Sequence, residues 1–215
     1  MPDGPLSLPA RLCLLAWDPA RPAGTGTAHL SGPVRAGALT ELARLGLLLD
    51  EDGIATPADL DSRTGDAVLD GLLELVRESC PRPWRTWVTL RSRVTLDAVR
   101  EQLVAEGYLR AEKKRVLGVF PSVEYELERR AAVQALREET RQILRGPLPV
   151  AGVFERDAAV ATLAASAELL PAKDVGAHEQ RVRELAERAV ASAPGLGEIV
   201  DEIRTALAAT ATAPP

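Results

Sequence analysis

The sequence predicts a mainly α-helical fold, a single helical domain with a projecting β-hairpin. Aromatic residues make up only 3% of the 215 residues, so Leu, Val and Ala must build the core. Ala and Leu are strong helix formers. Because no interruption resembles an interdomain linker, we expect one helical domain over residues 10–209, between a flexible leader (1–9) and a disordered tail (210–215).

The N-terminal half is expected to hold a series of helices. The apolar run 12–17 fits either a buried strand or the end of a helix. Ser31 and Pro33 form a helix start signal, and apolar residues then recur on one face until Gly46 ends the helix. A turn and a short strand near Ile54 follow, and further helices are expected over 66–78, 84–90 and 96–106.

Residues 108–127 are predicted to form a β-hairpin with its bend at Pro121-Ser122. A lone two-stranded hairpin is marginally stable, and an exposed apolar edge invites pairing with another chain. Burial against the helical body would stabilise this hairpin and cover its apolar edge, and contact with a partner chain would do the same. The residues expected to make that contact are apolar: Val116, Val119, Phe120 and Val123.

The chain then predicts four more helices, over 129–144, 156–170, 178–192 and 197–209. The net charge of −5 argues against a general nucleic-acid binder, whose affinity comes from neutralising phosphates. Residues 77–115, however, carry ten basic and five acidic side chains. This basic middle favours an anionic partner on one side of the molecule.

Nothing in the sequence carries a catalytic signature. His29 and His178 are far apart and lack carboxylates or Cys at ligand spacing, and no nucleophile elbow, phosphate loop or dinucleotide motif is present. We therefore expect no enzyme activity, no cofactor and no metal site. The N-terminus lacks the basic region of a signal peptide, and no apolar run could span a bilayer, so a cytoplasmic protein is expected.

One alternative is a winged-helix transcriptional regulator that binds DNA. The segment 102–109 ends a helix at a glycine and enters the predicted hairpin, as a third helix enters its wing. The helix 96–106 opposes this interpretation, because Asp97, Glu101 and Glu106 stand beside only Arg100 and would repel phosphates. A helical adaptor with protein partners is a further alternative.

Several motifs together resemble the Golgi phosphoprotein 3 family, over roughly residues 12–207. They are Arg35…Glu41-Leu42-Ala43…Gly46, Gly65-Asp66…Leu69-Asp70, Trp87 and Leu103-Val104…Gly107…Leu109. The resemblance implies a mostly helical fold with a projecting hairpin that binds phosphatidylinositol 4-phosphate at a membrane surface. It also implies pairing of chains through the hairpin. The abundance of Ala and Arg suggests a bacterial member of this family.

The family's phosphate pocket uses a Trp and three Arg. By this resemblance, one Arg falls on Arg35 and a second on Arg93, while the third position is Leu96 and the Trp position lies near Gly26. Arg91 or Trp17 are the candidate substitutes for the missing groups. Two Arg can still clamp a phosphate bidentately, so Arg35, Arg93 and Arg91 are the predicted headgroup ligands.

The sequence thus predicts a non-enzymatic protein that docks reversibly on anionic membrane lipid. Its expected partners are the anionic lipid and a second copy of the chain through the hairpin, and no nucleic acid is expected. Protein clients and the identity of the lipid stay open.

Overall fold

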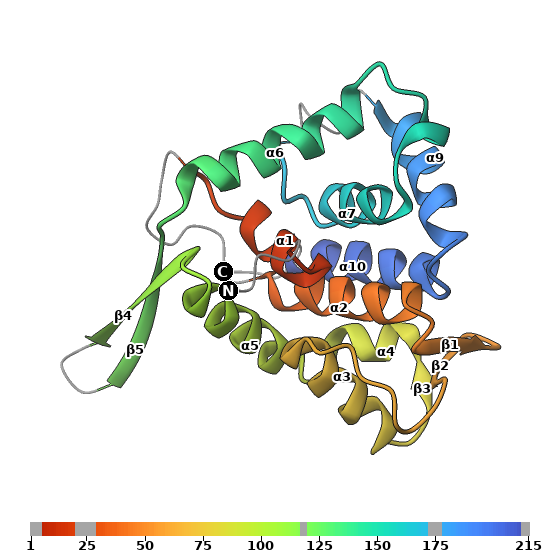
Figure 1. Ribbon diagram of the computed structural model, residues 1–215, viewed down its shortest axis with the longest axis horizontal. Coiled ribbons are helices and arrows are strands. Elements are labelled where there is room, and N and C mark those ends of the chain that lie inside the picture. Colours follow the sequence, from red (N-terminus) through yellow and green to blue (C-terminus); the bar gives the residue numbers. More distant parts are fainter. Residues whose placement is uncertain (1–5, 20–28, 117–119, 172–177, 212–215) are drawn as a thin grey trace.

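In the computed structural model, which describes residues 6–19, 29–116, 120–171 and 178–211, helices surround a short central helix (Figure 1). The predicted mainly α-helical fold with a hairpin is confirmed. The first half contains α1 (Leu8–Leu15), α2 (Ser31–Arg44), β1 (Leu48–Glu51), β2 (Ile54–Pro57), α3 (Ala67–Arg77), β3 (Arg82–Pro83), α4 (Trp84–Thr89) and α5 (Ser92–Ala105). The second half contains β4 (Leu109–Val116), β5 (Phe120–Leu127), α6 (Arg130–Arg145), the 3-10 turn η2 (Val150–Gly152), α7 (Glu155–Ser166), α9 (Glu179–Val190) and α10 (Leu196–Ala211).

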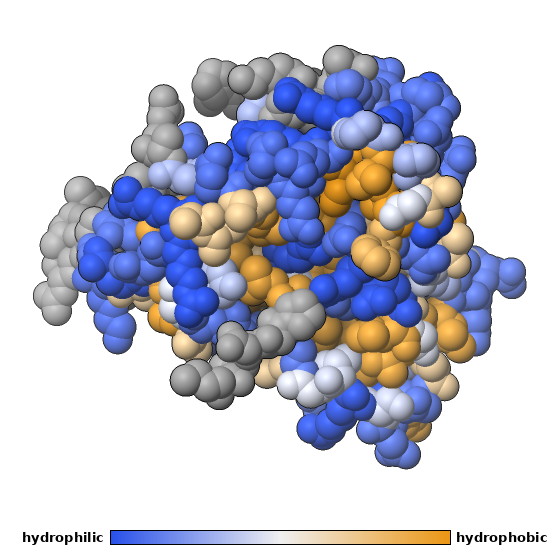
Figure 2. All heavy atoms as spheres, turned by 45° about the horizontal axis from the view of Figure 1, so that its top comes forward, coloured by the Kyte–Doolittle hydropathy of each residue, from blue (hydrophilic) through white to orange (hydrophobic). Residues whose placement is uncertain are grey.

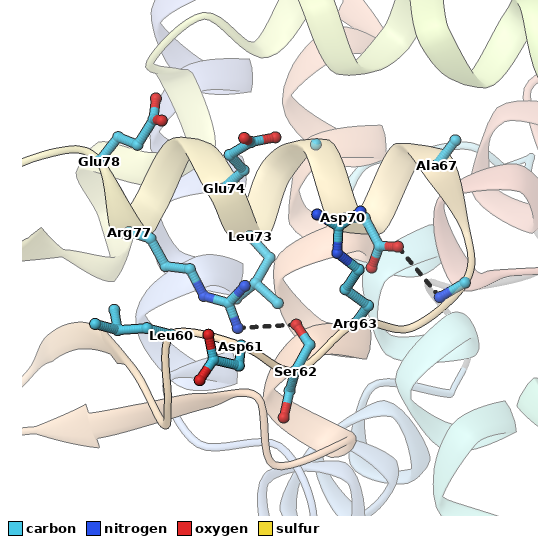
Figure 3. Close-up of a pocket in the computed structure, with 12 residues that line it drawn as sticks. Leu60, Asp61, Ser62, Arg63, Ala67, Asp70, Leu73, Glu74, Arg77 and Glu78 are labelled. Atoms are coloured by element: carbon cyan, nitrogen blue, oxygen red, sulfur yellow. Dashed lines mark hydrogen bonds between the residues drawn. The ribbon is translucent and has the colours of Figure 1, made fainter.

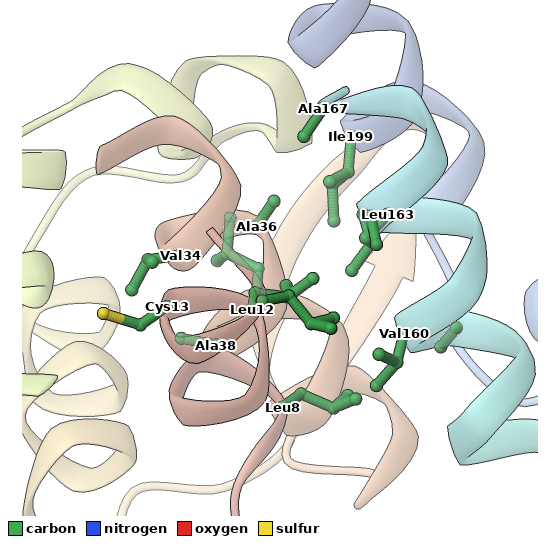
Figure 4. Close-up of a cluster of buried hydrophobic side chains, with 14 of the residues drawn as sticks. Leu8, Leu12, Cys13, Val34, Ala36, Ala38, Val160, Leu163, Ala167 and Ile199 are labelled. Carbon is green, nitrogen blue, oxygen red and sulfur yellow. The ribbon is translucent and has the colours of Figure 1, made fainter. Parts of the chain in front are cut away.

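The central helix α1 is buried along its whole length. All eight of its residues are buried, and it packs against α2, α5, α6 and α7. Figure 4 shows Leu8 and Leu12 of α1 close to Val160 and Leu163 of α7. Arg11 is the one charged residue of α1 and pairs with Asp157 at 2.7 Å, while the other seven residues are apolar, so the helix is more stable inside the protein than facing water.

This placement corrects two boundaries drawn from the sequence. The predicted leader 1–9 is too long, because α1 begins at Leu8 and carries Pro9 in its first turn, where proline is tolerated. The run 12–17, which fitted a strand or a helix end, is helical up to Leu15. At the other terminus α10 extends to Ala211, into the predicted tail 210–215, in a segment rich in alanine.

Helices α1 and α2 approach each other closely at Gly37. A β-carbon on Gly37 would lie 2.6 Å from Cδ1 of Leu12 and 3.1 Å from the backbone nitrogen of Pro9. Glycine is therefore needed here for packing rather than for an unusual backbone angle. The contact brings the start of α1 onto the middle of α2, which positions the helices around the candidate sites described below.

A small antiparallel sheet, in the order β1-β2-β3, is joined to the helical body by Trp84. The indole Nε1 of Trp84 donates a 2.7 Å hydrogen bond to Oδ1 of Asp50. Its ring is fully buried and lies against Gly195, where an added β-carbon would lie 2.2 Å from a ring carbon. Gly195 also has a φ of +75°, so both its backbone and its neighbour require glycine.

Strands β4 and β5 form the expected hairpin, which extends away from the helical body (Figure 1). Their register runs from Leu109 opposite Leu127 to Val116 opposite Phe120. Pro121 and Ser122 are both paired positions of β5, so the prediction of a bend at these two residues is wrong. Pro121 lies in β5 opposite Arg115, and both strands of a two-stranded hairpin are edges, where proline is tolerated.

The base of the hairpin is held by two contacts between a cation and an aromatic ring. The guanidinium of Arg100, on α5, lies 5.1 Å from the ring centroid of Tyr125. Arg129 lies 4.7 Å from the ring centroid of Tyr108. Such contacts contribute about 0.5–1 kcal/mol each at exposed sites and more when they are desolvated. The contact of Arg100 with Tyr125 holds the hairpin against α5, and the contact of Arg129 with Tyr108 holds its base at the start of α6.

Hydrophilic residues cover most of the face shown in Figure 2, and hydrophobic residues gather in patches between them. Among the helices that the structure describes, none has the length and apolar character needed to cross a bilayer.

Candidate functional site

The starts of α2 and α5 line one small pocket, about 170 Å³ in volume. Ser31, Gly32 and Pro33 contribute from α2, and Thr89 and Ser92 from the junction of α4 and α5. Neither helix has a side chain that caps its first turn. The first backbone N–H groups of a helix lack partners within the helix and carry partial positive charge, so such ends favour anions.

The remaining wall of this pocket comes from His29 and from α10. Ile203, Ala206 and Leu207 form an apolar side, and Thr210 adds a hydroxyl. The pocket is therefore polar where the helices begin and apolar along α10. His29 is exposed and lines the same pocket as the α2 and α5 starts, a placement that no sequence motif indicated.

Arg35, the first predicted headgroup ligand, lies inside the protein. Its side chain is 1% exposed, and its Nη2 donates a 2.7 Å hydrogen bond to the backbone oxygen of Arg91. Its Nε and Nη1 are buried without a hydrogen-bond partner, and no described carboxylate lies within ion-pair distance. Burial lowers the pKa of Arg35 to about 10, so the group is still protonated at neutral pH. The buried guanidinium of Arg35 is therefore hydrogen-bonded to the junction of α4 and α5 from inside the protein.

Arg91 and Arg93, the other two predicted ligands, are exposed at this junction. Arg91 has a left-handed backbone, with φ at 51°, and directly precedes α5, which begins at Ser92. For a residue with a side chain this conformation costs about 1–2 kcal/mol, so the contact from Arg35 helps to hold it. Val94, one residue beyond Arg93, is 65% exposed and adds an apolar side chain to the same corner.

The structure thus brings Arg35 and Arg91 together and leaves Arg93 two residues further along on α5. The two other family positions do not contribute charge or an accessible ring. Leu96 is buried in the core, and so is the candidate substitute Trp17. Gly26 lies outside the described residues.

A larger cleft among the described residues, about 730 Å³, lies elsewhere, between α3 and the loop that precedes it (Figure 3). Arg77 reaches this loop from α3, and its Nη2 donates a 2.9 Å hydrogen bond to the backbone oxygen of Ser62. The carboxylate of Asp70 accepts hydrogen bonds from the backbone of Thr64 and Gly65. The cleft is thus bordered by a loop that side chains of α3 hold in place.

The same contacts explain the motif Gly65-Asp66…Leu69-Asp70. Asp66 caps α3, because its Oδ1 accepts from the backbone nitrogens of Val68 and Leu69. Burial acts to raise the pKa of Asp70, but the hydrogen bonds from Thr64 and Gly65 outweigh it, and the net effect is a lowered pKa. Both carboxylates therefore have structural roles, in the loop and at the helix start.

The hairpin residues predicted for oligomerisation are placed only in part. Val119 lies outside the described residues, and Val116 and Phe120 form the last described pair of the ladder. Val123 lies opposite Lys113 and is exposed.

The comparisons with known proteins agree with the sequence motifs. A family model described as Golgi phosphoprotein 3 (GPP34) matches residues 8–206, from the first residue of α1 into α10. A search of curated proteins gave no match. Since the family model covers well over half of the 215 residues, the chain belongs to the Golgi phosphoprotein 3 family.

Proposed function

We propose that this protein docks reversibly on anionic membrane surfaces and takes a phosphate-bearing lipid headgroup, of the phosphatidylinositol 4-phosphate kind, at the corner where α2 and α5 begin. In this proposal Arg91 and Arg93 contact the headgroup, and Arg35 holds Arg91 in position. The protein would act as a cytoplasmic, peripheral membrane protein without enzymatic activity.

The observation that carries the proposal is the concentration of positive charge at one corner of an acidic protein. Two uncapped helix starts, two exposed guanidinium groups and one buried guanidinium lie at or next to a single pocket. Neither Arg91 nor Arg93 has an ion-pair partner among the described residues, whereas the whole chain carries a net charge of −5. Their unpaired charge supports recruitment of an anion.

Val94 supports a lipid surface rather than a free anion as the target. Its exposed side chain follows Arg93 directly, so an apolar group and two cations share one turn of chain. Interfacial binding combines such electrostatic attraction with shallow burial of apolar side chains.

Sedimentation with liposomes of defined headgroup tests the proposal. Binding should rise from neutral phosphatidylcholine vesicles to vesicles with anionic lipid, and again with phosphatidylinositol 4-phosphate, and it should fall with added salt. Arg91→Ala with Arg93→Ala should lower binding, while the matched surface change Arg85→Ala on α4 should not. Parent and double variant binding equally well would contradict the proposal.

A DNA mobility-shift assay run in parallel covers the alternative of a winged-helix regulator. A sequence-selective shift without liposome binding would support that regulator instead. Absence of both would favour an adaptor with protein partners alone.

A further inference from the structure

A second cleft, about 460 Å³, lies where the start of α1, the end of α2, the start of α3 and the end of α5 meet. It shares no lining residue with the pocket at the starts of α2 and α5. Its charged and polar side chains form two separate clusters, one around Glu41 and one around Gln102. Each cluster has a surplus of one kind of hydrogen-bonding group.

The cluster around Glu41 has a surplus of donors. Glu41 is buried, and its Oε1 accepts hydrogen bonds from Nε and Nη2 of Arg156 at 3.2 and 3.0 Å. Its Oε2 accepts from the backbone nitrogen of Leu8. Arg44 is left with a long contact of 3.8 Å to the same carboxylate, and its Nε is buried without a partner. One carboxylate therefore serves two guanidinium groups and a helix start.

The cluster around Gln102 has a surplus of acceptors. The Nε2 of Gln102 donates to Oδ2 of Asp66 and to Oε1 of Glu106, both at 3.2 Å. Its own Oε1 is buried and accepts no hydrogen bond. Neither carboxylate is in an ion pair with any Lys, Arg or His of the described chain. Apart from the backbone N–H groups of α3 that Oδ1 of Asp66 caps, the two carboxylates receive only the amide of Gln102 among the described residues, and the amide oxygen of Gln102 receives no donor from them.

We infer that this cleft binds a small zwitterion, with an anionic oxygen group at Arg44 and a primary ammonium at Gln102 and Glu106. The cluster around Glu41 holds two guanidinium groups and one carboxylate, whereas the cluster around Gln102 holds two carboxylates and no cation of the described chain, so a molecule with an anionic oxygen group and an ammonium complements the charge of both. Arg44 retains 26% of its side chain exposed, and Leu45 beside it is 47% exposed. The mouth of the cleft therefore stays open and partly apolar.

O-phosphoethanolamine is the probe that fits this chemistry, and calorimetric titration of the full chain measures its binding. O-phosphocholine is the matched control, because its trimethylated nitrogen has the same charge and no N–H donor. Inorganic phosphate and ethanolamine test each half alone. We expect O-phosphoethanolamine to bind about tenfold or more tightly than each of the three others, a difference of about 1.4 kcal/mol or more.

Two variants test which residue binds the phosphate and which binds the ammonium of the probe. Arg44→Met should weaken binding of O-phosphoethanolamine and of phosphate, whereas Glu106→Gln should weaken binding of O-phosphoethanolamine and of ethanolamine. The controls are Arg85→Met on the surface of α4 and Glu101→Gln on the same helix as Glu106, and neither should change binding. Thermal melts followed by circular dichroism establish that each variant is folded.

Equal binding of O-phosphoethanolamine and O-phosphocholine, or binding that neither Arg44→Met nor Glu106→Gln changes, would overturn the inference. Since the comparison of probes uses the parent protein, it remains decisive even where a variant fails to fold. Vesicles of phosphatidylethanolamine and of phosphatidylcholine then show whether the natural ligand is a lipid headgroup or a free metabolite. If phosphatidylethanolamine vesicles compete with the soluble probe, the ligand is a lipid headgroup. If they do not compete, it is a free metabolite. The result is independent of the Arg91 and Arg93 site.

Discussion

The guanidinium of Arg35 donates a 2.7 Å hydrogen bond to the backbone oxygen of Arg91, across 56 positions of the chain. The donor is buried and the acceptor residue is exposed, with a left-handed backbone. A charge inside the protein is thus coupled to the conformation of a charge at its surface. A buried cation without a counter-ion costs free energy of folding, so its retention here needs a reason. Replacing Arg35 tests directly whether that reason is its contact with Arg91.

Replacement of Arg35 by Met should weaken binding to anionic liposomes although Arg35 is not exposed. The variant removes both the buried charge and the contact that holds Arg91. Its thermal midpoint should stay close to the parent's, because the lost hydrogen bond is offset by the removal of an unpaired buried charge. Circular dichroism melts and sedimentation measure the two effects. Unchanged liposome binding would remove Arg35 from the proposed site.

The two cysteines should differ strongly in reactivity. Burial raises the pKa of Cys13 to about 12, and its side chain is inaccessible, whereas Cys80 is exposed. Iodoacetamide at pH 8 should therefore modify Cys80 rapidly and Cys13 only in denaturant, because the thiolate is the reactive form. Mass spectrometry of peptides reports both sites, and the Cys80→Ser protein should show no rapid modification.

The raised pKa of Cys13 also predicts a dependence of stability on pH. The folded pKa of Cys13 lies above its unfolded value of 9.0, so its contribution is complete below pH 9 and is lost as the pH rises toward 12. Urea unfolding of parent and Cys13→Ala at pH 8 and pH 10 should show the parent losing more stability over this interval. An equal loss in both proteins would contradict the assignment.

Gly37→Ala should destabilise the protein by about 1–3 kcal/mol, because the new methyl group would collide with Leu12 and with the backbone at Pro9. Gly71→Ala is the matched control. Gly71 is exposed in α3, with no atom within 4 Å of an added β-carbon. That change should stabilise the protein by up to about 1 kcal/mol, since alanine favours the helix. Urea unfolding distinguishes the opposite signs.

Deletion of 114–123 from the hairpin, with a Gly-Ser bridge, should leave a folded helical protein. The contacts of Tyr108 with Arg129 and of Tyr125 with Arg100 remain in the shortened chain. If the hairpin joins two chains, as the family resemblance implies, the deletion should elute from size exclusion as a smaller assembly than the parent. A parent protein that is already monomeric at high concentration would contradict this prediction.

Local signals in the sequence predict the helices α2, α3, α6, α9 and α10 to within a few residues, because apolar periodicity and end signals act over short stretches of chain. The hairpin is likewise predicted by its β-forming residues. The predicted start of α5 is four residues late, at Leu96 instead of Ser92, because Ser-Arg-Val-Thr contains no apolar repeat.

The sequence by itself determined the fold class, the family and the presence of an Arg pair near the start of α5, since composition, spacing and motifs are properties of the chain. Only the tertiary structure decided which of these Arg side chains faces water. Arg35 is inside and Arg91 outside because α2 is packed between other helices, whereas the junction of α4 and α5 lies at the surface. The surplus of hydrogen-bond donors around Glu41 and of acceptors around Gln102 likewise involves segments far apart in the chain. Their hydrogen bonds exist only once the helices have packed.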